Sequence, residues 1–549
     1  MRYADAEQVK PTLTDGGEIA FLDVREAGQY GEGHPFFAVN VPYSRLEALA
    51  PALLPRRTVR CVLFDDGDGV AERAATRLSA LGYTALTIMR GGAPAWAAAG
   101  FTLFKGVNLP SKTFGELVEH AMDTPSISAG ELKAAQEAGD DFVLLDGRTP
   151  GEFRKMTLPG ARSCPNAELG YRIGALGLGP ATRVVVSCAG RTRSIIGAQT
   201  LRNLGVANDV VALRNGTQGW MLAGFDLARH RDPDPLPALT AALLEDSGHT
   251  ARRLIASAGL RLIGADDLAR QRADTSRTSY LFDVRSAGEY ASGHVPGAVH
   301  APGGQLVQAT DQWVAARNAQ IVLSDDTGLR AATTALWLRG MGHKIAILDD
   351  DAARQAQAPV VAPAPLSKLT LVASGEVPLV APAEVPGRLA AGAVLLDLSP
   401  SMAYRAAHIV GARWAIRPRL GDVDFDGASE ILLAARDREV GVSDDGGASP
   451  ATGATIAEAA AIDLVELTDL PISRLAGTPE TWRAAGLDVV ATPECPADTD
   501  CIDYLFFVHD RHGTNMAAAQ AYLDWETGLI AQLDPQERAV LKPERSLPG

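Results

Sequence analysis

One cysteine of the chain begins a loop rich in glycine, arginine and hydroxyl side chains. An apolar run at 184–187 precedes this loop and a helical pattern follows it, so the loop is expected to join a buried strand to a helix. The loop consists of Cys188, Ala189, Gly190, Arg191, Thr192, Arg193 and Ser194.

Successive backbone N–H groups of such a loop, together with the N-terminus of the helix behind it, can form a cradle that binds an anion. The cradle and the two arginines favour the thiolate of Cys188, which is the nucleophilic form of a cysteine. Arg191 and Arg193 offer the paired N–H donors that suit a dianionic substrate. The loop therefore predicts a nucleophilic cysteine that acts on an anionic compound.

The surroundings of this loop recur along the chain. A strand-like run that ends in Asp-x-Arg, followed by Tyr and Gly-His, appears at 21–34 and again at 281–294. Two more divergent copies have Asp146 and Asp397 at the end of the same run. Each copy continues into a second apolar run, and the four second runs lie at 61–64, 184–187, 321–324 and 440–443. Four copies of one unit are therefore predicted.

The position after the second run differs among the copies. Asp65, Cys188 and Asp325 each lie 42 residues after the Asp that ends the first run, and Asp444 lies 47 residues after it. The acidic pairs that begin at the three aspartates suggest a metal site or phosphotransfer, but a carboxylate that caps the amides of a helix N-terminus explains them better. We expect Asp65, Asp325 and Asp444 to fill the cradle that the second copy leaves to its cysteine.

The alternation of short strands and helices predicts an α/β fold, with a small, mainly parallel sheet covered by helices on both faces in each copy. The expected domains are 1–108 with Asp65, 120–232 with Cys188, 255–357 with Asp325 and a truncated end, and 370–490 with Asp444. Linkers are expected at 232–237 and 358–365. A C-terminal tail at 491–549 follows, and its segment 515–533 has helical spacing and is expected to dock as a helix.

These motifs resemble the rhodanese family of sulfurtransferases, whose domains have an Asp-x-Arg strand end, a Gly-His-x-x-Gly-Ala motif and a catalytic cysteine loop before a helix. The resemblance covers about residues 5–490 and leaves the tail unexplained. It implies four tandem rhodanese-like domains, of which only the second is catalytic because the other three lack the cysteine. It also implies that an inactive copy, either the first or the third, walls the cleft around Cys188.

The activity that the resemblance implies is that of a thiosulfate sulfurtransferase without a cofactor. Cys188 would take sulfane sulfur from thiosulfate or an anionic persulfide, carry it as a persulfide, and pass it to cyanide or a thiol. Residues 189–194 and Arg148 would bind the substrate. Arg148 would also support the loop from the neighbouring strand end, and Asp146 would organise local backbone hydrogen bonds. Phosphatase relatives of this fold have a loop one residue longer, which argues against a phosphatase or an arsenate reductase.

The sequence is also compatible with a function that is not catalytic. The repeats would then hold a partner of sulfur metabolism, and Cys188 would serve as a sulfur carrier or a redox sensor. The sequence leaves open the physiological donor and acceptor, the role of the tail, and whether the chain forms a homo-oligomer.

The other cysteines are expected to be structural. Cys61 begins an apolar run and belongs to a core, and Cys164 is expected to pack in a core rather than to resolve a Cys188 persulfide as a disulfide. Cys495 and Cys501, with His509 and His512, have no usual zinc spacing, so we expect a loop and strand packed against the fourth domain instead of a metal site.

Composition excludes several classes of function. The 549 residues suggest roughly three to four domains. The net charge of −15 disfavours nucleic acid and acidic membranes as partners. No run approaches the ~18 apolar residues of a membrane span. An acidic N-terminus without an apolar core and five scattered cysteines lead us to expect a cytoplasmic protein without disulfides.

Overall fold

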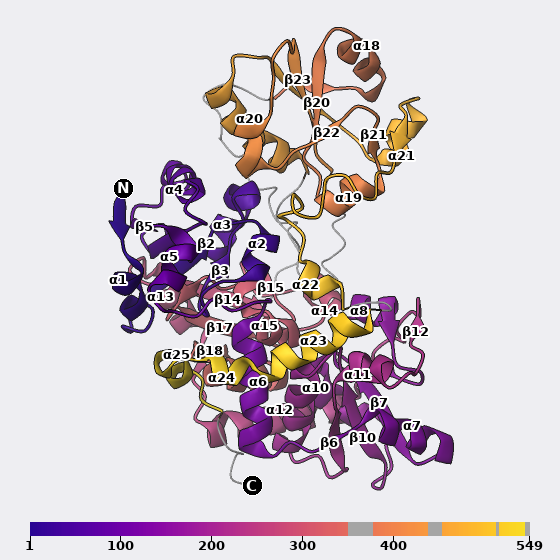
Figure 1. Cartoon of the computed structure of the whole chain (residues 1–549). Helices are drawn as coiled ribbons and strands as arrows, with labels where there is room; N and C mark the ends of the chain where they lie inside the picture. Colours follow the sequence, from indigo (N-terminus) through magenta and orange to yellow (C-terminus); the bar gives the residue numbers. More distant parts are fainter. Residues whose placement is uncertain (350–376, 437–452, 512–514, 544–549) are drawn as a thin grey trace.

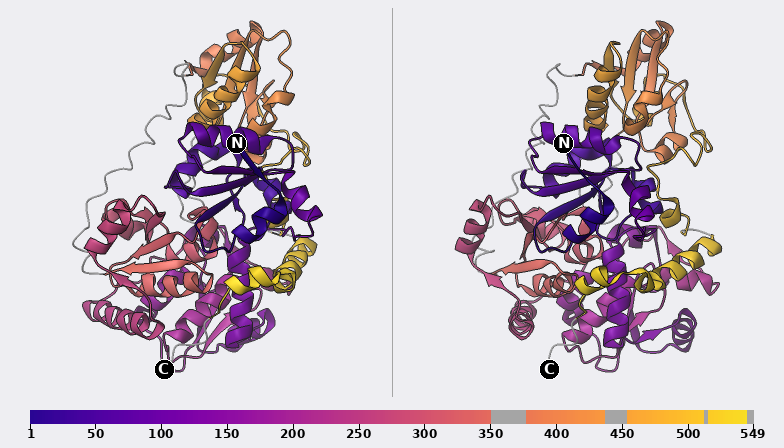
Figure 2. Two further views of the ribbon diagram at one scale, coloured as in Figure 1. Left: turned by 90° about the vertical axis from the view of Figure 1, so that its left-hand side faces the viewer. Right: turned by 60° about the vertical axis from the view of Figure 1, so that its left-hand side comes forward.

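The computed structural model describes residues 1–349, 377–436, 453–511 and 515–543. These residues form four α/β units of one design and a helical C-terminal tail (Figure 1). We call the units copies one to four in chain order. Copies one to three lie together, and copy four stands beyond copy one (Figures 1 and 2).

Copy one is followed by a long connecting helix, α6. Its elements are β1 Arg2–Ala4, α1 Ala6–Thr12, β2 Ile19–Asp23, α2 Ala27–Glu32, β3 Val39–Asn40, η1 Tyr43–Arg45, α3 Leu46–Leu53, β4 Arg60–Phe64, α4 Val70–Ala80, β5 Leu86–Met89, α5 Gly92–Ala98 and α6 Leu109–Met122.

Copy two repeats the pattern and is followed by the connecting helix α12. Its elements are β6 Ser126–Ile127, α7 Ala129–Ala138, β7 Phe142–Asp146, α8 Pro150–Lys155, β8 Met156–Thr157, β9 Arg162–Ser163, α9 Asn166–Arg172, η2 Ile173–Leu176, β10 Arg183–Ser187, α10 Thr192–Asn203, β11 Val210–Leu213, α11 Gly216–Leu222, β12 Ala228–Arg229 and α12 Ala241–Ala258.

Copy three is described as far as its last parallel strand. Its elements are β13 Leu262–Ile263, α13 Ala265–Ala273, β14 Ser279–Asp283, α14 Ala287–Ser292, β15 Val299–His300, α15 Gly303–Gln308, η3 Thr310–Gln312, β16 Ala316–Arg317, β17 Gln320–Ser324, α16 Leu329–Gly340 and β18 Lys344–Leu348. The predicted truncated end, from 350 on, and the linker at 358–365 lie outside the described residues.

Copy four and the tail complete the chain. Copy four has β19 Leu379–Val380, η4 Pro382–Glu384, α18 Val385–Ala390, β20 Ala393–Asp397, α19 Ser401–Ala406, β21 His408–Ile409, β22 Arg413–Trp414, η5 Arg417–Asp422, β23 Glu430–Ala434, α20 Gly453–Leu467, β24 Ile472–Leu475, α21 Pro479–Ala484 and β25 Val489–Val490. The tail has α22 Phe506–His509, α23 Met516–Thr527, α24 Leu529–Gln532 and α25 Pro535–Val540, so the predicted helix at 515–533 is present as two helices.

Three of the sheets have the same five-strand order, which in copy two is β6-β11-β10-β7-β9, and copy one has the equivalent order with β16 of copy three added at its edge. The two central strands of each sheet are parallel and apolar, as expected for strands covered by helices on both faces. The two central strands of each of these four sheets therefore end at the same edge of the sheet. The loops that lead to the helices begin at this edge.

The central register corrects one prediction. Asp146 pairs with Ser187, Asp23 with Phe64 and Asp283 with Ser324, but Asp397 pairs with Ala434. In copy four the second run is therefore Glu430–Ala434, and Ala435 stands where the other copies have Cys188, Asp65 or Asp325.

The prediction of Asp444 at this position was thus wrong, because the more apolar run at 431–434 takes the central place in the sheet. The run at 440–443 suggested Asp444 because it contains two valines and is followed by an acidic pair, as the second runs of copies one and three are. That run, Asp444 and Asp445 lie outside the described residues.

Copies one and three share an apolar core, to which α6 and the tail also contribute. Strand β16 of copy three pairs antiparallel with β2 of copy one, and the Tyr280 hydroxyl donates to the Leu53 carbonyl of copy one at 2.6 Å. Copy two and copy four each have separate cores on the two faces of their sheets. In the described ranges, no helix combines the length and apolar character needed to cross a membrane.

Copies two and three are joined by a buried ion network around Arg330, whose side chain is fully buried. The guanidinium contacts Glu168 of copy two at 2.9 Å and, within copy three, Glu289 at 2.6 Å, Asp325 at 3.0 Å and Asp326 at 2.8 Å. Arg172 also pairs with Glu168 at 2.8 Å and with Glu289 at 3.1 Å. Removal of Arg330 would leave the fully buried Asp325 carboxylate without the cation that it contacts.

We predict that Arg330→Met lowers the stability of the paired copies by about 3–5 kcal/mol, the usual cost of breaking a buried ion pair from one side. Urea unfolding followed by tryptophan fluorescence measures the shift. The matched control is Arg270→Met, since that arginine is 71% exposed and pairs with Asp267 at the surface. Its shift should be below about 1 kcal/mol. Equal shifts in the two variants would contradict a structural role for the network.

Candidate active site

Cys188 follows strand β10 and begins the loop that leads into α10. The parallel register of Ser187 with Asp146 places it beside the end of β7. The cysteine is 2% exposed, and Ala189, Thr192 and Ser194 are also buried. The seven loop residues predicted from the sequence thus lie together at the carboxyl edge of the central strands, and most of them are buried.

Helix α11 holds the first two loop residues through their carbonyl groups. The Thr217 amide donates to the Cys188 carbonyl at 2.8 Å, and the Gln218 amide donates to the Ala189 carbonyl at 3.1 Å. Gly216 makes this approach feasible, because a Cβ at its position would lie 2.1 Å from the Cys188 carbonyl oxygen and because its φ is +50°. Copy one repeats the arrangement, with the Ala93 amide on the Asp65 carbonyl at 2.8 Å.

Arg148 and Asp146 form a buried pair at the end of β7. The guanidinium donates to the Asp146 carboxylate at 2.7 Å and to the Met156 carbonyl at 2.6 Å, and the carboxylate also accepts the Arg148 amide at 3.1 Å and the Thr157 hydroxyl at 2.8 Å. Arg25 with Asp23 and Arg285 with Asp283 repeat the pair in copies one and three. Its presence in copies without the cysteine indicates an architectural role in this part of the structure.

Arg191 is paired with carboxylates of α6. It contacts Glu116 through two N–H···O bonds of 2.6 and 2.8 Å, contacts Glu119, and donates to the Asn215 side chain at 3.3 Å. Burial raises the pKa of Glu116 to about 7 against the lowering by Arg191. The pairing holds the guanidinium on the α6 side of the loop.

Arg193 has a comparable arrangement on the opposite side of the loop. It contacts Glu152 through two bonds of 2.6 Å and the Gln305 side chain of copy three at 3.3 Å. Burial alone would raise the pKa of Glu152, but Arg193 and Arg148 outweigh it and lower that pKa to about 2. That Arg191 and Arg193 bind an anionic substrate stays a prediction.

Three of the groups that surround the loop were not expected from the sequence. Lys112 and Glu116 lie on α6, whose residues 109–119 fell between two predicted domains, and Glu526 lies on α23 of the tail. The apolar spacing of Phe114, Leu117 and Val118 is the sequence signal that could have revealed α6. The loop is therefore walled by α6, by the tail and, through Gln305, by copy three.

The aspartates of copies one and three fill their loops as predicted. Asp65 accepts the amides of Gly67 and Ala71, both at 2.9 Å. Asp325 accepts the amides of Asp326 and Arg330, both at 2.8 Å. A carboxylate thus occupies the start of the helix at the position that Cys188 has in copy two.

The predictions for the other cysteines can now be compared with the structure. Cys61 and Cys164 pack in apolar cores, as expected. Cys501 is buried in a loop that contacts copy four, where Arg405 donates to the Pro496 carbonyl at 3.0 Å, but the expected strand is absent from the described residues 491–505. His512 lies outside the described residues, and those that are described hold no group of three metal-ligating side chains.

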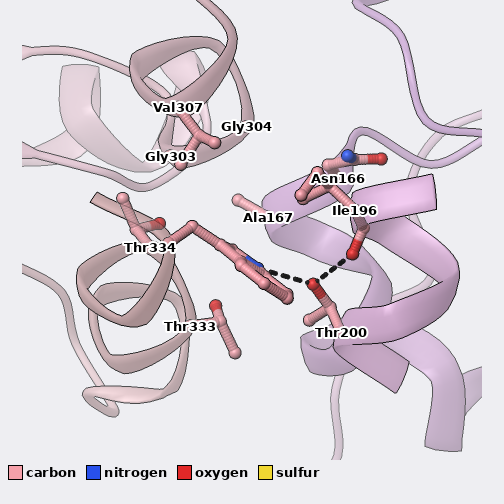
Figure 3. A pocket seen from close by; sticks show the side chains of 10 residues that line it. Asn166, Ala167, Ile196, Thr200, Gly303, Gly304, Val307, Thr333 and Thr334 are labelled. Atoms are coloured by element: carbon pink, nitrogen blue, oxygen red, sulfur yellow. Dashed lines mark hydrogen bonds between the residues drawn. The ribbon is translucent and has the colours of Figure 1, made fainter. Parts of the chain in front are cut away.

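A cavity between copies two and three is a separate feature. It lies between α9 and α10 on one side and α15 and α16 on the other, and Trp337 donates there to the Thr200 hydroxyl at 2.9 Å (Figure 3). Its volume of about 20 Å³ has room for one water molecule. The cavity is too small for a substrate.

Comparisons with known proteins agree with the geometry. The family model for the rhodanese-like domain matches residues 5–99, 128–223 and 265–352. The crystal structure of a thiosulfate sulfurtransferase from Pseudomonas aeruginosa is 36% identical, covers 100% of both chains and has a TM-score of 0.88.

Two curated relatives are similar over shorter stretches. A thiosulfate sulfurtransferase of Pseudomonas aeruginosa is 28% identical over 210 residues, which are 35% of this chain and 74% of the relative. A thiosulfate sulfurtransferase of Azotobacter vinelandii is 28% identical over 155 residues, which are 25% of this chain and 56% of the relative.

We predict that Gly216→Ala displaces the Cys188 loop, because its Cβ would overlap the Cys188 carbonyl. Alkylation of Cys188 should slow about tenfold or more, because the displaced thiol leaves the amides at the start of α10 that favour its reactive thiolate. The matched control is Gly224→Ala, which has a similar left-handed φ of +83° but open space around its Cβ. Both variants should lose about 1–2 kcal/mol of stability from backbone strain. Peptide mass spectrometry after iodoacetamide treatment measures the rate, and equal rates in the two variants would contradict the role given to Gly216.

Proposed function

The chain belongs to the rhodanese-like domain family and is a sulfurtransferase; on that premise, we propose that Cys188 carries the sulfur as a persulfide. The proposed donor is thiosulfate or an anionic persulfide, and the proposed acceptor is cyanide or a thiol. The proposed site consists of Cys188 with residues 189–194, supported by Arg148 and Asp146.

The observation that carries this proposal is the place of Cys188 in a fold that occurs four times. Cys188 stands at the carboxyl end of β10, before a loop and a helix, where copies one and three have aspartates bonded to loop or helix amides and copy four has Ala435. One copy therefore has a nucleophile at this position, and the others support it as scaffold.

The proposed reaction has two steps and needs no further reactant. The Cys188 thiolate attacks the outer sulfur of thiosulfate, so that a bond forms between Sγ and that sulfur while the S–S bond of thiosulfate breaks and sulfite leaves with the electron pair. In the second step cyanide attacks the terminal sulfur, thiocyanate leaves, and the thiolate is restored. The amides at the start of α10 stabilise the negative persulfide between the steps.

We predict that Cys188→Ser reduces thiosulfate-to-cyanide transfer by about 1000-fold or more, because the attacking sulfur is lost. Asp65→Asn, at the same position in copy one, should keep the wild-type rate. Intact mass spectrometry after thiosulfate treatment should show an adduct of ~32 Da, one sulfur atom, that is missing in the serine variant. An adduct without thiocyanate formation would instead indicate a dedicated carrier, and no adduct in the wild type would refute the persulfide.

A second prediction concerns the charge of the loop. Arg191→Ala should raise the KM for thiosulfate about tenfold, the effect of one charge-assisted bond, and should change the KM for a neutral donor such as dimethyl trisulfide much less. Arg202→Ala, at the exposed end of the same helix, is the control for general charge effects. Equal changes with both donors would mean that Arg191 only holds α6 through Glu116.

A further inference from the structure

The tail helix α23 lies on the Cys188 loop, although more than 300 residues separate the two in sequence. It packs on α11, which seats the loop, and on α6, and the tail helices run along α6 between copies one and two (Figures 1 and 2). The tail is thus part of the surroundings of the site, a role that the sequence pattern did not disclose.

Glu526 is the residue of α23 that reaches the loop. It is 1% exposed, and its Oε1 accepts the Thr192 hydroxyl at 2.8 Å and contacts Lys112 Nζ at 3.3 Å. Its Oε2 lies 2.9 Å from the point where a Cβ on Gly190 would stand. The Glu526 carboxylate therefore lies beside Gly190, which follows Cys188 by two positions in the chain. It contacts both the Lys112 ammonium group and the Thr192 hydroxyl group.

Two buried polar groups at this place have no hydrogen-bond partner among the described residues. One is Oε2 of Glu526, and the other is the side-chain amide of Gln218, whose Nε2 lies 3.9 Å from the same point on Gly190. Gln218 is 2% exposed, so it cannot be satisfied by bulk solvent. Buried groups of this kind cost free energy unless a ligand or water satisfies them.

The ammonium group of Lys112 lies close to three side chains of α23. Its Nζ lies 5.0 Å from the Tyr522 ring and 5.6 Å from the Trp525 ring, besides its contact with Glu526. Burial would raise the pKa of Glu526, but Lys112, the Thr192 hydroxyl and Arg511 together outweigh it and lower that pKa, so the carboxylate is charged at neutral pH. When α23 withdraws, the ammonium group loses this anion and needs another one.

We propose that Lys112 and Thr192 form a subsite for the oxyanion end of the sulfur donor, and that Glu526 occupies this subsite while α23 covers the loop. The ammonium and the hydroxyl suit the oxygens of thiosulfate, and Gln218 adds an unused N–H donor. Since Cys188 is 2% exposed, a donor reaches it only when part of its cover moves, and we assign this movement to α23, whose Glu526 lies against Thr192 and Gly190. The donor then exchanges for the Glu526 carboxylate, one anion for another, and no bond is made or broken in this exchange.

The identity of the anion rests on the proposed function, so the experiment is chosen not to need sulfur transfer. The full-length protein is alkylated with iodoacetate, which carries a carboxylate, and with neutral iodoacetamide, and modification of Cys188 is followed by peptide mass spectrometry. The variants are Glu526→Gln and, as matched control, Asp524→Asn, an exposed acid on the same helix. Cys495 is exposed and provides an internal reference for reagent reactivity.

In Glu526→Gln the rate with iodoacetate should rise about fivefold more than the rate with iodoacetamide, because the freed ion-pair partner attracts the anion. Asp524→Asn should leave both rates unchanged, and adding Lys112→Met to Glu526→Gln should remove the advantage of iodoacetate. Equal acceleration with both reagents would reduce α23 to a steric cover and overturn the subsite. No acceleration, or an advantage that survives Lys112→Met, would overturn it as well.

A parallel measurement separates this proposal from the proposed function. In Glu526→Gln the KM for thiosulfate should fall about fivefold, an effect of one ion pair. If the iodoacetate advantage is found while the wild type transfers no sulfur from thiosulfate to cyanide, the anion subsite stands and the proposed reaction of Cys188 fails. If sulfur is transferred and neither measurement responds to Glu526→Gln, the subsite fails and the proposed function stands.

Discussion

The parallel pairing of β10 with β7 is the constraint on which the rest of the site depends. Because Ser187 is level with Asp146, the residue after the strand leaves the sheet beside the Arg148 pair and directly under α11. The backbone there has little room, because a Cβ at Gly216 would lie only 2.1 Å from the Cys188 carbonyl oxygen. The backbone of Cys188, the proposed nucleophile, is thus held by main-chain hydrogen bonds.

The same constraint acts in the copies without a cysteine, and there it has a different consequence. A short carboxylate at this position accepts the amides that follow it, as Asp65 and Asp325 do, and the loop closes on itself. Asp325 also joins the Arg330 network, which binds copy three to copy two. The loop of copy three, which has an aspartate where copy two has Cys188, is therefore part of a domain interface.

Several charged and polar groups around the Cys188 loop come from outside copy two, whereas Glu152, which pairs with Arg193, belongs to copy two itself. Glu116 and Lys112 come from the connecting helix α6, Gln305 from copy three and Glu526 from the tail. Copy two by itself would lack the charges of Glu116, Lys112 and Glu526.

Much was determined by the sequence alone. The order of short apolar runs and helices and the Asp-x-Arg strand ends identified the α/β units, because these signals are local and repeat at constant spacing. The lone cysteine loop predicted Cys188 as the reactive residue. The capping roles of Asp65 and Asp325 followed from the same spacing.

Only the tertiary structure decided the central strand of copy four, where Ala435 and not Asp444 follows the second run, since register depends on which segment pairs with β20. It also decided that Arg191 and Arg193 are ion-paired and that Glu526 covers the loop. Such contacts join residues up to 334 positions apart. The local sequence pattern carries no information about which distant charged residues will meet in one buried site.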